Sequence, residues 1–174
     1  MEVFIEQIVK KRRSLSDALI VLALSAASVI LSLFLFLLSA KFSMFSTIFI
    51  FAIAAVFYFA YLFATSRNLE YEYSMVNHEI DIDKIMNQKR RKRLITLNVK
   101  KMEAFGKKGK GADYERYISD SSVKKIYACA DKTADNVFYA VYFNEGNKYM
   151  LLFSPKQEII DMIVKFNPRE KFDI

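Results

Sequence analysis

The sequence has little of the chemistry that enzymes and metal sites most often use. Its 174 residues include one cysteine, one histidine and no tryptophan. A single cysteine excludes a disulfide framework and a cysteine-rich zinc site, and a lone histidine has no second histidine with which to share a metal. Because no nucleophile stands beside a recognisable base, we expect a protein that is not an enzyme, with no catalytic residue, cofactor or metal.

Glycine and proline are also scarce, with four and two residues, whereas 53% of the chain is hydrophobic. A chain this apolar does not remain disordered. Its net charge is +7. The composition therefore predicts a folded, basic protein.

Two long apolar runs occupy much of the first 66 residues. Residues 18–40 are 23 consecutive positions without a charge, and residues 42–66 are 25 more after Lys41 alone. At about 1.5 Å per helical residue these runs reach roughly 35 and 37 Å, enough to cross a hydrocarbon core of about 30 Å. A cleaved signal peptide would have a shorter apolar core and no second run. Residues 18–66 are therefore predicted to form a transmembrane hairpin of two helices.

The basic residues predict the direction in which the hairpin crosses. Lys10, Lys11, Arg12 and Arg13 precede the first run, and five more basic residues follow the second at 89–93. The turn carries only Lys41. Cytoplasmic segments are enriched in lysine and arginine. We therefore expect a multi-pass protein of the cell membrane with both termini in the cytoplasm.

Apolar residues recur with helical spacing ahead of the first run. Met1, Phe4, Ile5, Ile8 and Val9 stand at i, i+3, i+4, i+7 and i+8, with polar residues between them. This spacing predicts an amphipathic cytoplasmic helix within residues 1–17. The helix would lie in the headgroup region or pack on the domain that follows, and both alternatives stay open.

Beyond residue 66 the hydrophobic period changes from helical to alternating. Apolar and polar residues alternate through 69–76, 79–83 and 92–99, which predicts three strands. Three further strands are predicted over 124–130, 137–143 and 148–153, the second of them central and covered on both faces. The glycine–lysine segment 106–111 and the polar stretch as far as 122 are predicted to form a mobile loop.

The last predicted element is a helix over 155–167, with Ser154 as N-cap, Pro155 at the first position and Gln157 completing a capping box. Residues 67–174 are thus expected to form a cytoplasmic β-rich domain with a C-terminal helix. The predicted fold class is an α+β membrane protein: an N-terminal transmembrane helical hairpin, then an antiparallel β-sandwich or barrel closed by that helix.

A curved meander closed by one terminal helix resembles the pleckstrin-homology (PH) superfold, whose bacterial members are often fused to two transmembrane helices. Three segments are also similar to a family of clostridial two-helix membrane proteins known as a domain of unknown function: Asn68-Leu-Glu-Tyr-Glu-Tyr, Glu79-Ile-Asp-Ile-Asp-Lys-Ile and Lys89-Arg-Arg-Lys-Arg-Leu. The resemblance implies a PH-like cytoplasmic domain and supplies no catalytic residue. The basic run is continuous, unlike the spaced Lys-x-Arg pattern of eukaryotic lipid-binding members.

The candidate binding residues are that basic run: Lys89, Arg90, Arg91, Lys92 and Arg93. Near a bilayer each charge is worth about 1 kcal/mol of attraction to anionic headgroups, and the same charges would attract an acidic protein. Alternatively, the run only completes the topology signal and neutralises a neighbouring acidic strand. Both interpretations stay open.

Other polar residues are weaker candidates. Glu79, Asp81 and Asp83 share a strand face and could present oxygens to a divalent cation, although such rows more often face basic neighbours. Cys129 is expected to be a small buried residue, and His78 a solvent-facing turn residue.

Together these features predict a non-enzymatic, membrane-anchored interaction module whose cytoplasmic domain binds a protein partner or the inner leaflet. The alternative is an accessory subunit of a membrane complex, in which the helical hairpin is the binding element. The expected partners are the lipid bilayer, crossed by two spans, with anionic headgroups or an unknown protein. We expect no nucleic acid, because strand aromatics usually belong to the core and the chain is anchored.

Overall fold

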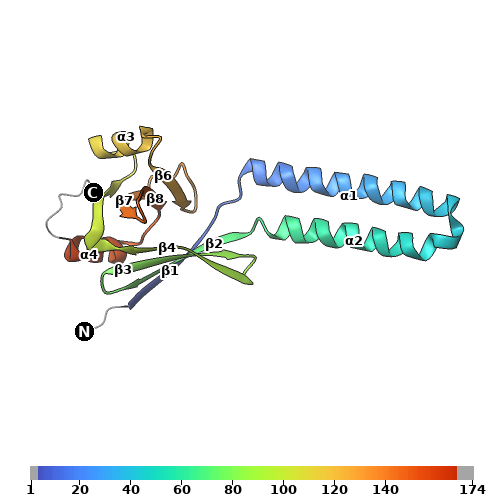
Figure 1. Ribbon diagram of the computed structural model, residues 1–174, viewed down its shortest axis with the longest axis horizontal. Helices are drawn as coiled ribbons and strands as arrows, with labels where there is room; N and C mark the ends of the chain where they lie inside the picture. Colours follow the sequence, from blue (N-terminus) through green and yellow to red (C-terminus); the bar gives the residue numbers. More distant parts are fainter. Residues whose placement is uncertain (1–3, 168–174) are drawn as a thin grey trace. The chain divides into compact units, whose positions relative to one another are not determined.

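The computed structural model describes residues 4–167 (Figure 1). The chain divides into two compact units, residues 13–68 and residues 1–12 together with 69–174. We call the first the helical hairpin and the second the β-domain. The hairpin is therefore an insertion within the β-domain sequence.

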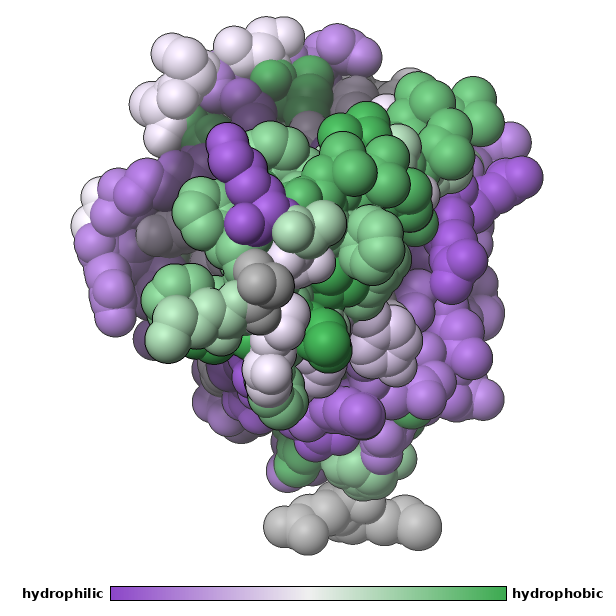
Figure 2. All heavy atoms as spheres, turned by 90° about the vertical axis from the view of Figure 1, so that its right-hand side faces the viewer, coloured by the Kyte–Doolittle hydropathy of each residue, from purple (hydrophilic) through white to green (hydrophobic). Residues whose placement is uncertain are grey.

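The helical hairpin consists of α1 (Leu15–Lys41), a short 3-10 turn (Ser43–Phe45) and α2 (Ser46–Thr65). Both helices are long and apolar enough to cross a membrane. Most of their large hydrophobic side chains are exposed, and Figure 2, which looks toward the turn between the helices, shows this hydrophobic surface in green. α1 begins with a capping box, in which the Ser14 hydroxyl accepts from the Ser16 amide and the Asp17 carboxylate accepts from the Ser14 amide.

The first sheet of the β-domain is antiparallel throughout. Its strands lie in the order β1 (Phe4–Lys10), β2 (Leu69–Val76), β3 (Glu79–Met86) and β4 (Arg90–Asn98). Alternation along β2 turns Tyr71, Tyr73 and Met75 into the core. The strands predicted over 69–76 and 79–83 are confirmed, and the strand expected over 92–99 begins slightly earlier.

The amphipathic helix predicted within residues 1–17 is wrong, because residues 4–10 form β1. The apolar positions also fit a period of two: Ile5 and Val9 face the core beside Met75 and Tyr71 of β2, whereas Phe4 and Ile8 are exposed. The ladder with β2 pairs the backbone of this segment along its length, whereas a short isolated helix leaves the N–H groups of its first turn and the C=O groups of its last turn without partners. Tertiary pairing therefore overrides the helical pattern.

The second sheet lies in the order β5 (Met102–Lys107), β7 (Phe138–Asn144), β8 (Asn147–Phe153) and β6 (Lys124–Ala128), with a 3-10 turn (Val99–Lys101) before β5. β7 occupies an interior position, as predicted. The expectation of a wholly antiparallel fold is wrong at one place, since β6 pairs with β8 in parallel. β7 and β8 form an antiparallel hairpin, and β6 adds to the far side of β8.

A helix that the sequence analysis missed, α3 (Ala112–Ser119), lies in the stretch predicted to be a mobile loop. Tyr114 and Tyr117 are buried, and the Tyr114 ring lies 5.5 Å from that of Tyr139 on β7. These contacts belong to a cluster on one face of the second sheet. α3 is short and polar, and its buried side consists of these two tyrosines and the half-buried Ile118.

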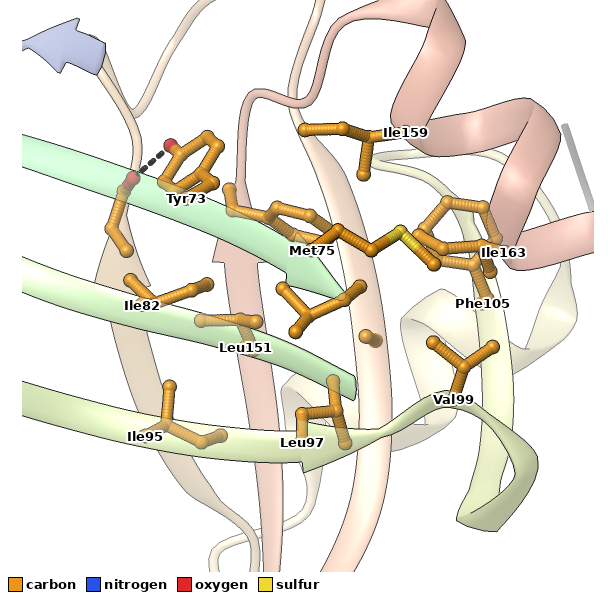
Figure 3. Close-up of a cluster of buried hydrophobic side chains, with 14 of the residues drawn as sticks. Tyr73, Met75, Ile82, Ile95, Leu97, Val99, Phe105, Leu151, Ile159 and Ile163 are labelled. Carbon is orange, nitrogen blue, oxygen red and sulfur yellow. Dashed lines mark hydrogen bonds between the residues drawn. The ribbon is translucent and has the colours of Figure 1, made fainter. Parts of the chain in front are cut away.

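The opposite face of the second sheet shares one core with the first sheet and with α4 (Gln157–Phe166). Figure 3 shows this cluster, in which Met75 of β2 points toward α4 and its Ile159 and Ile163, and Ile82 and Leu151 belong to the same core. The predicted capping by Ser154 is wrong. Residue 154 is buried, and Lys156 holds the N-cap position without a side-chain hydrogen bond.

Ser154 is instead part of a polar cluster that joins the first and last elements of the β-domain. Its amide donates to the Tyr73 hydroxyl at 3.2 Å, and its carbonyl accepts from Gln7 Nε2 of β1 at 2.9 Å. Gln7 Oε1 also accepts from the Lys156 amide at 2.7 Å. The predicted domain boundary at residue 67 is therefore corrected, because β1 is an integral strand of the β-domain.

Candidate basic interaction surface

The five basic candidates occupy the turn between β3 and β4 and the beginning of β4. Lys89 ends the turn, in which Asn87 and Gln88 have φ angles of 50° and 55°, and Arg90 begins the strand. Residues with positive φ reverse the chain tightly. The run therefore starts at one end of the first sheet and continues along its edge strand.

Two arginines of the run lie on the outer face of this sheet, opposite the core. Arg91 pairs with Glu72 of β2, and Arg93 pairs with Asp83 and Asp81 of β3, the Asp81 contact being 2.8 Å from Nη1 to Oδ2. Glu72 and Asp83 are register partners and are only 5% and 7% exposed. Buried carboxylates need such partners because desolvation penalises an unpaired charge. Arg91 and Arg93 therefore have a structural role.

Arg93 makes the larger set of contacts. Its hydrogen bond with Asp83 raises the pKa of the guanidinium, and the nearby charge of Asp81 adds to this against the effect of desolvation. Thr96 Oγ1 donates to Asp81 Oδ1 at 2.6 Å. The acidic row thus faces a basic neighbour, as such rows usually do, and within residues 4–167 no group of acidic, histidine and cysteine side chains suits a metal ion.

The remaining three residues of the run, Lys89, Arg90 and Lys92, are exposed and make no ion pair with any residue that the structure describes. Lys92 stands beside Lys84 in the register between β3 and β4. Like charges on adjacent strands repel, so the four side chains create a positive potential that an anion would relieve. We call Lys84, Lys89, Arg90 and Lys92 the basic corner.

The strand register places the basic corner at the end of the sheet where the chain enters and leaves the hairpin insertion. Arg90 is opposite Met86, and Met86 is opposite Leu69, the first residue of β2. Lys10, the last residue of β1, is opposite Glu70. The turn between β2 and β3 lies at the other end. Basic residues that are far apart in the sequence are thus gathered at one end of the sheet.

Two further lysines, Lys108 and Lys132, lie near the basic residues that precede the hairpin. The sequence analysis did not select them as candidates. The Arg12 amide donates to the Ala130 carbonyl at 2.7 Å, and its guanidinium lies 3.6 Å from the Asp131 carboxylate. In the same loop, the Lys132 carbonyl accepts from Lys108 Nζ. Lys108 and Lys132 therefore lie near the residue that precedes the hairpin. No pattern in the sequence predicts that Arg12, Lys108 and Lys132 lie close together. The only indication is that the glycine-rich segment with Lys108 is rich in lysine.

Cys129 is buried as expected, whereas His78 lies in the expected turn but is half-buried rather than solvent-facing. Cys129 is 5% exposed, and burial raises the pKa of its thiol, which disfavours the reactive thiolate. His78 lies in the turn between β2 and β3, with its ring 6.5 Å from that of Phe166.

Replacing Arg91 with Gln should destabilise the β-domain by about 1–2 kcal/mol, because Glu72 would keep a buried charge without its guanidinium partner. The matched Arg90→Gln variant should change the free energy of unfolding by less than about 0.5 kcal/mol, since that side chain is exposed. Urea denaturation of the full chain in detergent measures both. Equal effects would contradict the division of the run into structural and accessible residues.

Comparison with known proteins bears on the fold. Neither the curated proteins nor the solved structures contain a match to the chain. A family model described as a bacterial PH-like domain (DUF6106) matches residues 1–173, which include both the helical hairpin and the β-domain. The predicted PH-like resemblance is confirmed, whereas a clostridial source stays a prediction. The chain belongs to this family of bacterial PH-like domains.

Proposed function

We propose that the protein is a non-enzymatic, membrane-anchored interaction module. The helical hairpin crosses the cell membrane twice, the β-domain lies in the cytoplasm, and the basic corner contacts anionic headgroups of the inner leaflet. One observation carries this proposal: the basic side chains that make no ion pair with any described residue lie at the sheet end from which the chain passes into the hairpin.

The pairing of β1 with β2 supports a single orientation for both flanks of the hairpin. The two strands are antiparallel neighbours, and the Lys11 amide donates to the Leu69 carbonyl at 2.9 Å just beyond the ladder. Strands that are hydrogen-bonded in one sheet lie on the same side of a membrane. Because these flanks carry the basic residues and the turn carries only Lys41, that side is the cytoplasm.

The short connections support contact with the leaflet. Residues 66–68 link α2 to β2, and an extended chain spans at most about 14 Å over that distance. Residues 11–14 link β1 to α1, which limits the second connection to about 18 Å. Electrostatic attraction acts over about 8 Å at physiological salt. A domain held this closely places its basic end within or near the range of the headgroup charges.

Lipid is favoured over an acidic protein because of how the charges are presented. Three members of the basic corner, Lys89, Arg90 and Lys92, are exposed long side chains on a turn and an edge strand, and the half-buried Lys84 lies beside Lys92 on β3. Diffuse attraction to a charged surface needs no shaped pocket, and about 1 kcal/mol per charge is enough to orient a tethered domain.

The accessory-subunit alternative is favoured by one observation, that α2 buries none of its side chains in the described structure. Helices of membrane complexes often use such faces for docking. Affinity purification of the full chain and of residues 13–68 from native membranes separates the two proposals. Partners retained by the hairpin alone would support the subunit.

Topology is tested by a cysteine in the turn between the helices. Met44 is 92% exposed, and Cys129 is the chain's only cysteine and is buried. In intact cells a membrane-impermeant maleimide should label the Met44→Cys variant rapidly and leave the parent unlabelled. Labelling that requires permeabilised cells would reverse the orientation.

The leaflet contact is tested by replacing Lys89, Arg90 and Lys92 together with Gln in a chain that carries a fluorophore at Gln88→Cys and Cys129→Ser. In nanodiscs of anionic lipid, nitroxide-labelled headgroups should quench the parent strongly and the triple variant weakly, because about 3 kcal/mol of attraction is lost. Quenching of the parent should also be weak in nanodiscs of zwitterionic lipid, or at a salt concentration near 1 M.

The matched control replaces Lys100 and Lys101 with Gln. These exposed lysines follow β4 at the opposite end of the sheet, where the Val99 amide bonds to the His78 carbonyl. Their loss should leave quenching unchanged. If the triple variant is quenched as strongly as the parent, the lipid proposal is contradicted and a protein-binding role for the basic corner is favoured.

A further inference from the structure

We propose that the helical hairpin holds one anionic phospholipid in a cleft between the beginning of α1 and the end of α2. This site is separate from the basic corner, and it rests on the proposed membrane insertion. The cleft has a volume of about 490 Å³. Its lining includes two arginines, Arg13 before α1 and Arg67 after α2, and the apolar side chains of Val21, Leu22 and Ala64.

The cleft continues along the hairpin as a groove lined by both small and large side chains. A second hollow of about 250 Å³ shares Val21, Ser25 and Ala64 with the first and extends to Ser28 and Ala60. The short side chains on both helices leave this space open between larger ones such as Leu24, Phe57 and Tyr61, because they do not reach across it. The charged groups thus lie at one end of the hairpin, and the groove leads away from them along its apolar faces.

The charges of the cleft favour an anion. Arg67 Nη1 lies 3.5 Å from Asp17 Oδ1, and Arg13 Nη2 donates to the Asn68 side-chain oxygen at 2.9 Å. The second Asp17 oxygen accepts from the Ser14 amide at 3.4 Å, so this carboxylate is engaged at both oxygens. Two guanidiniums and one carboxylate leave a net positive charge. Each guanidinium has five N–H donors, and these contacts leave most of them for a phosphate.

The basic end and the apolar groove of the cleft together determine which ligand fits it. A phosphate between the arginines and an acyl chain along the groove would use both parts of the site at once. A free phosphate would leave the apolar walls uncovered, and a neutral lipid would leave the net positive charge uncompensated. α1 has 27 residues, about 40 Å of helix, so its first turn lies at headgroup depth when its apolar part spans the bilayer. Basic pockets between transmembrane helices on the cytoplasmic side bind such lipids.

Native mass spectrometry of the full chain in mild detergent tests this site, with phosphatidylglycerol or phosphatidylcholine of the same acyl chains as probes. The parent should retain one phosphatidylglycerol with a preference of about tenfold or more over phosphatidylcholine. Replacing Arg13 and Arg67 with Gln should abolish the preference. Equal retention of the two lipids by the parent would overturn the proposal, as would competition by inorganic phosphate alone.

A second variant keeps the charges and fills the groove. Ala64→Leu should lower retention of both lipids about tenfold, whereas Ala55→Leu, at an exposed α2 position outside both hollows, should not. If Ala64→Leu changes the oligomeric state and leaves lipid retention intact, the groove docks another helix and the lipid proposal fails.

The same samples distinguish this proposal from the proposed function. Washing with alkaline carbonate should leave the parent in the membrane fraction. Release of the protein by this wash would contradict the proposed membrane anchoring itself. The variant with Lys89, Arg90 and Lys92 replaced should retain phosphatidylglycerol like the parent, because the basic corner belongs to the other unit of the chain. Loss of retention in that variant would contradict a separate site in the hairpin.

Discussion

The pairing of β1 with β2 is the constraint on which the other features depend. These strands lie on either side of the helical hairpin in the sequence, yet they are hydrogen-bonded neighbours from Phe4 and Val76 to Lys10 and Glu70. Each ladder bond contributes only about 0.5–1.5 kcal/mol net, but Val9 and the Gln7 hydrogen bonds add burial and a link to the start of α4. The β-domain is thus completed by residues that precede the helical hairpin in the sequence.

The register of β2, β3 and β4 in the same sheet gives the two kinds of basic residue their different roles. Arg91 and Arg93 compensate carboxylates that the sheet buries, so their charge is used within the fold. Lys89, Arg90 and Lys92 have no such partner in the described structure, and the register sets them at the sheet end beside the hairpin connections. A continuous basic run in the sequence therefore combines a stabilising function with an accessible charge directed outside the domain.

The sequence predicted the elements whose signal is local. The charge-free runs predicted α1 and α2, and alternation predicted β2, β3, β7 and β8. It did not predict β1 or α3, because β1 is specified by its ladder with β2, and α3 by the packing of Tyr114 on Tyr139. The sequence was enough to select the basic residues as candidates. It did not predict which of them pair with buried carboxylates and which remain accessible. Which arginine meets a buried carboxylate depends on strand alternation and on a bulge between Ile82 and Asp83.

The most direct test of this account is to remove the insertion and keep the pairing. A chain in which a short Asn-Gly turn replaces residues 13–68 joins β1 to β2 as an ordinary hairpin. It should be soluble and unfold cooperatively in urea, whereas residues 69–174 alone should be less stable by about 3 kcal/mol or more, because they lack β1. Equal stability of the two chains would show that β1 is dispensable and would contradict the account.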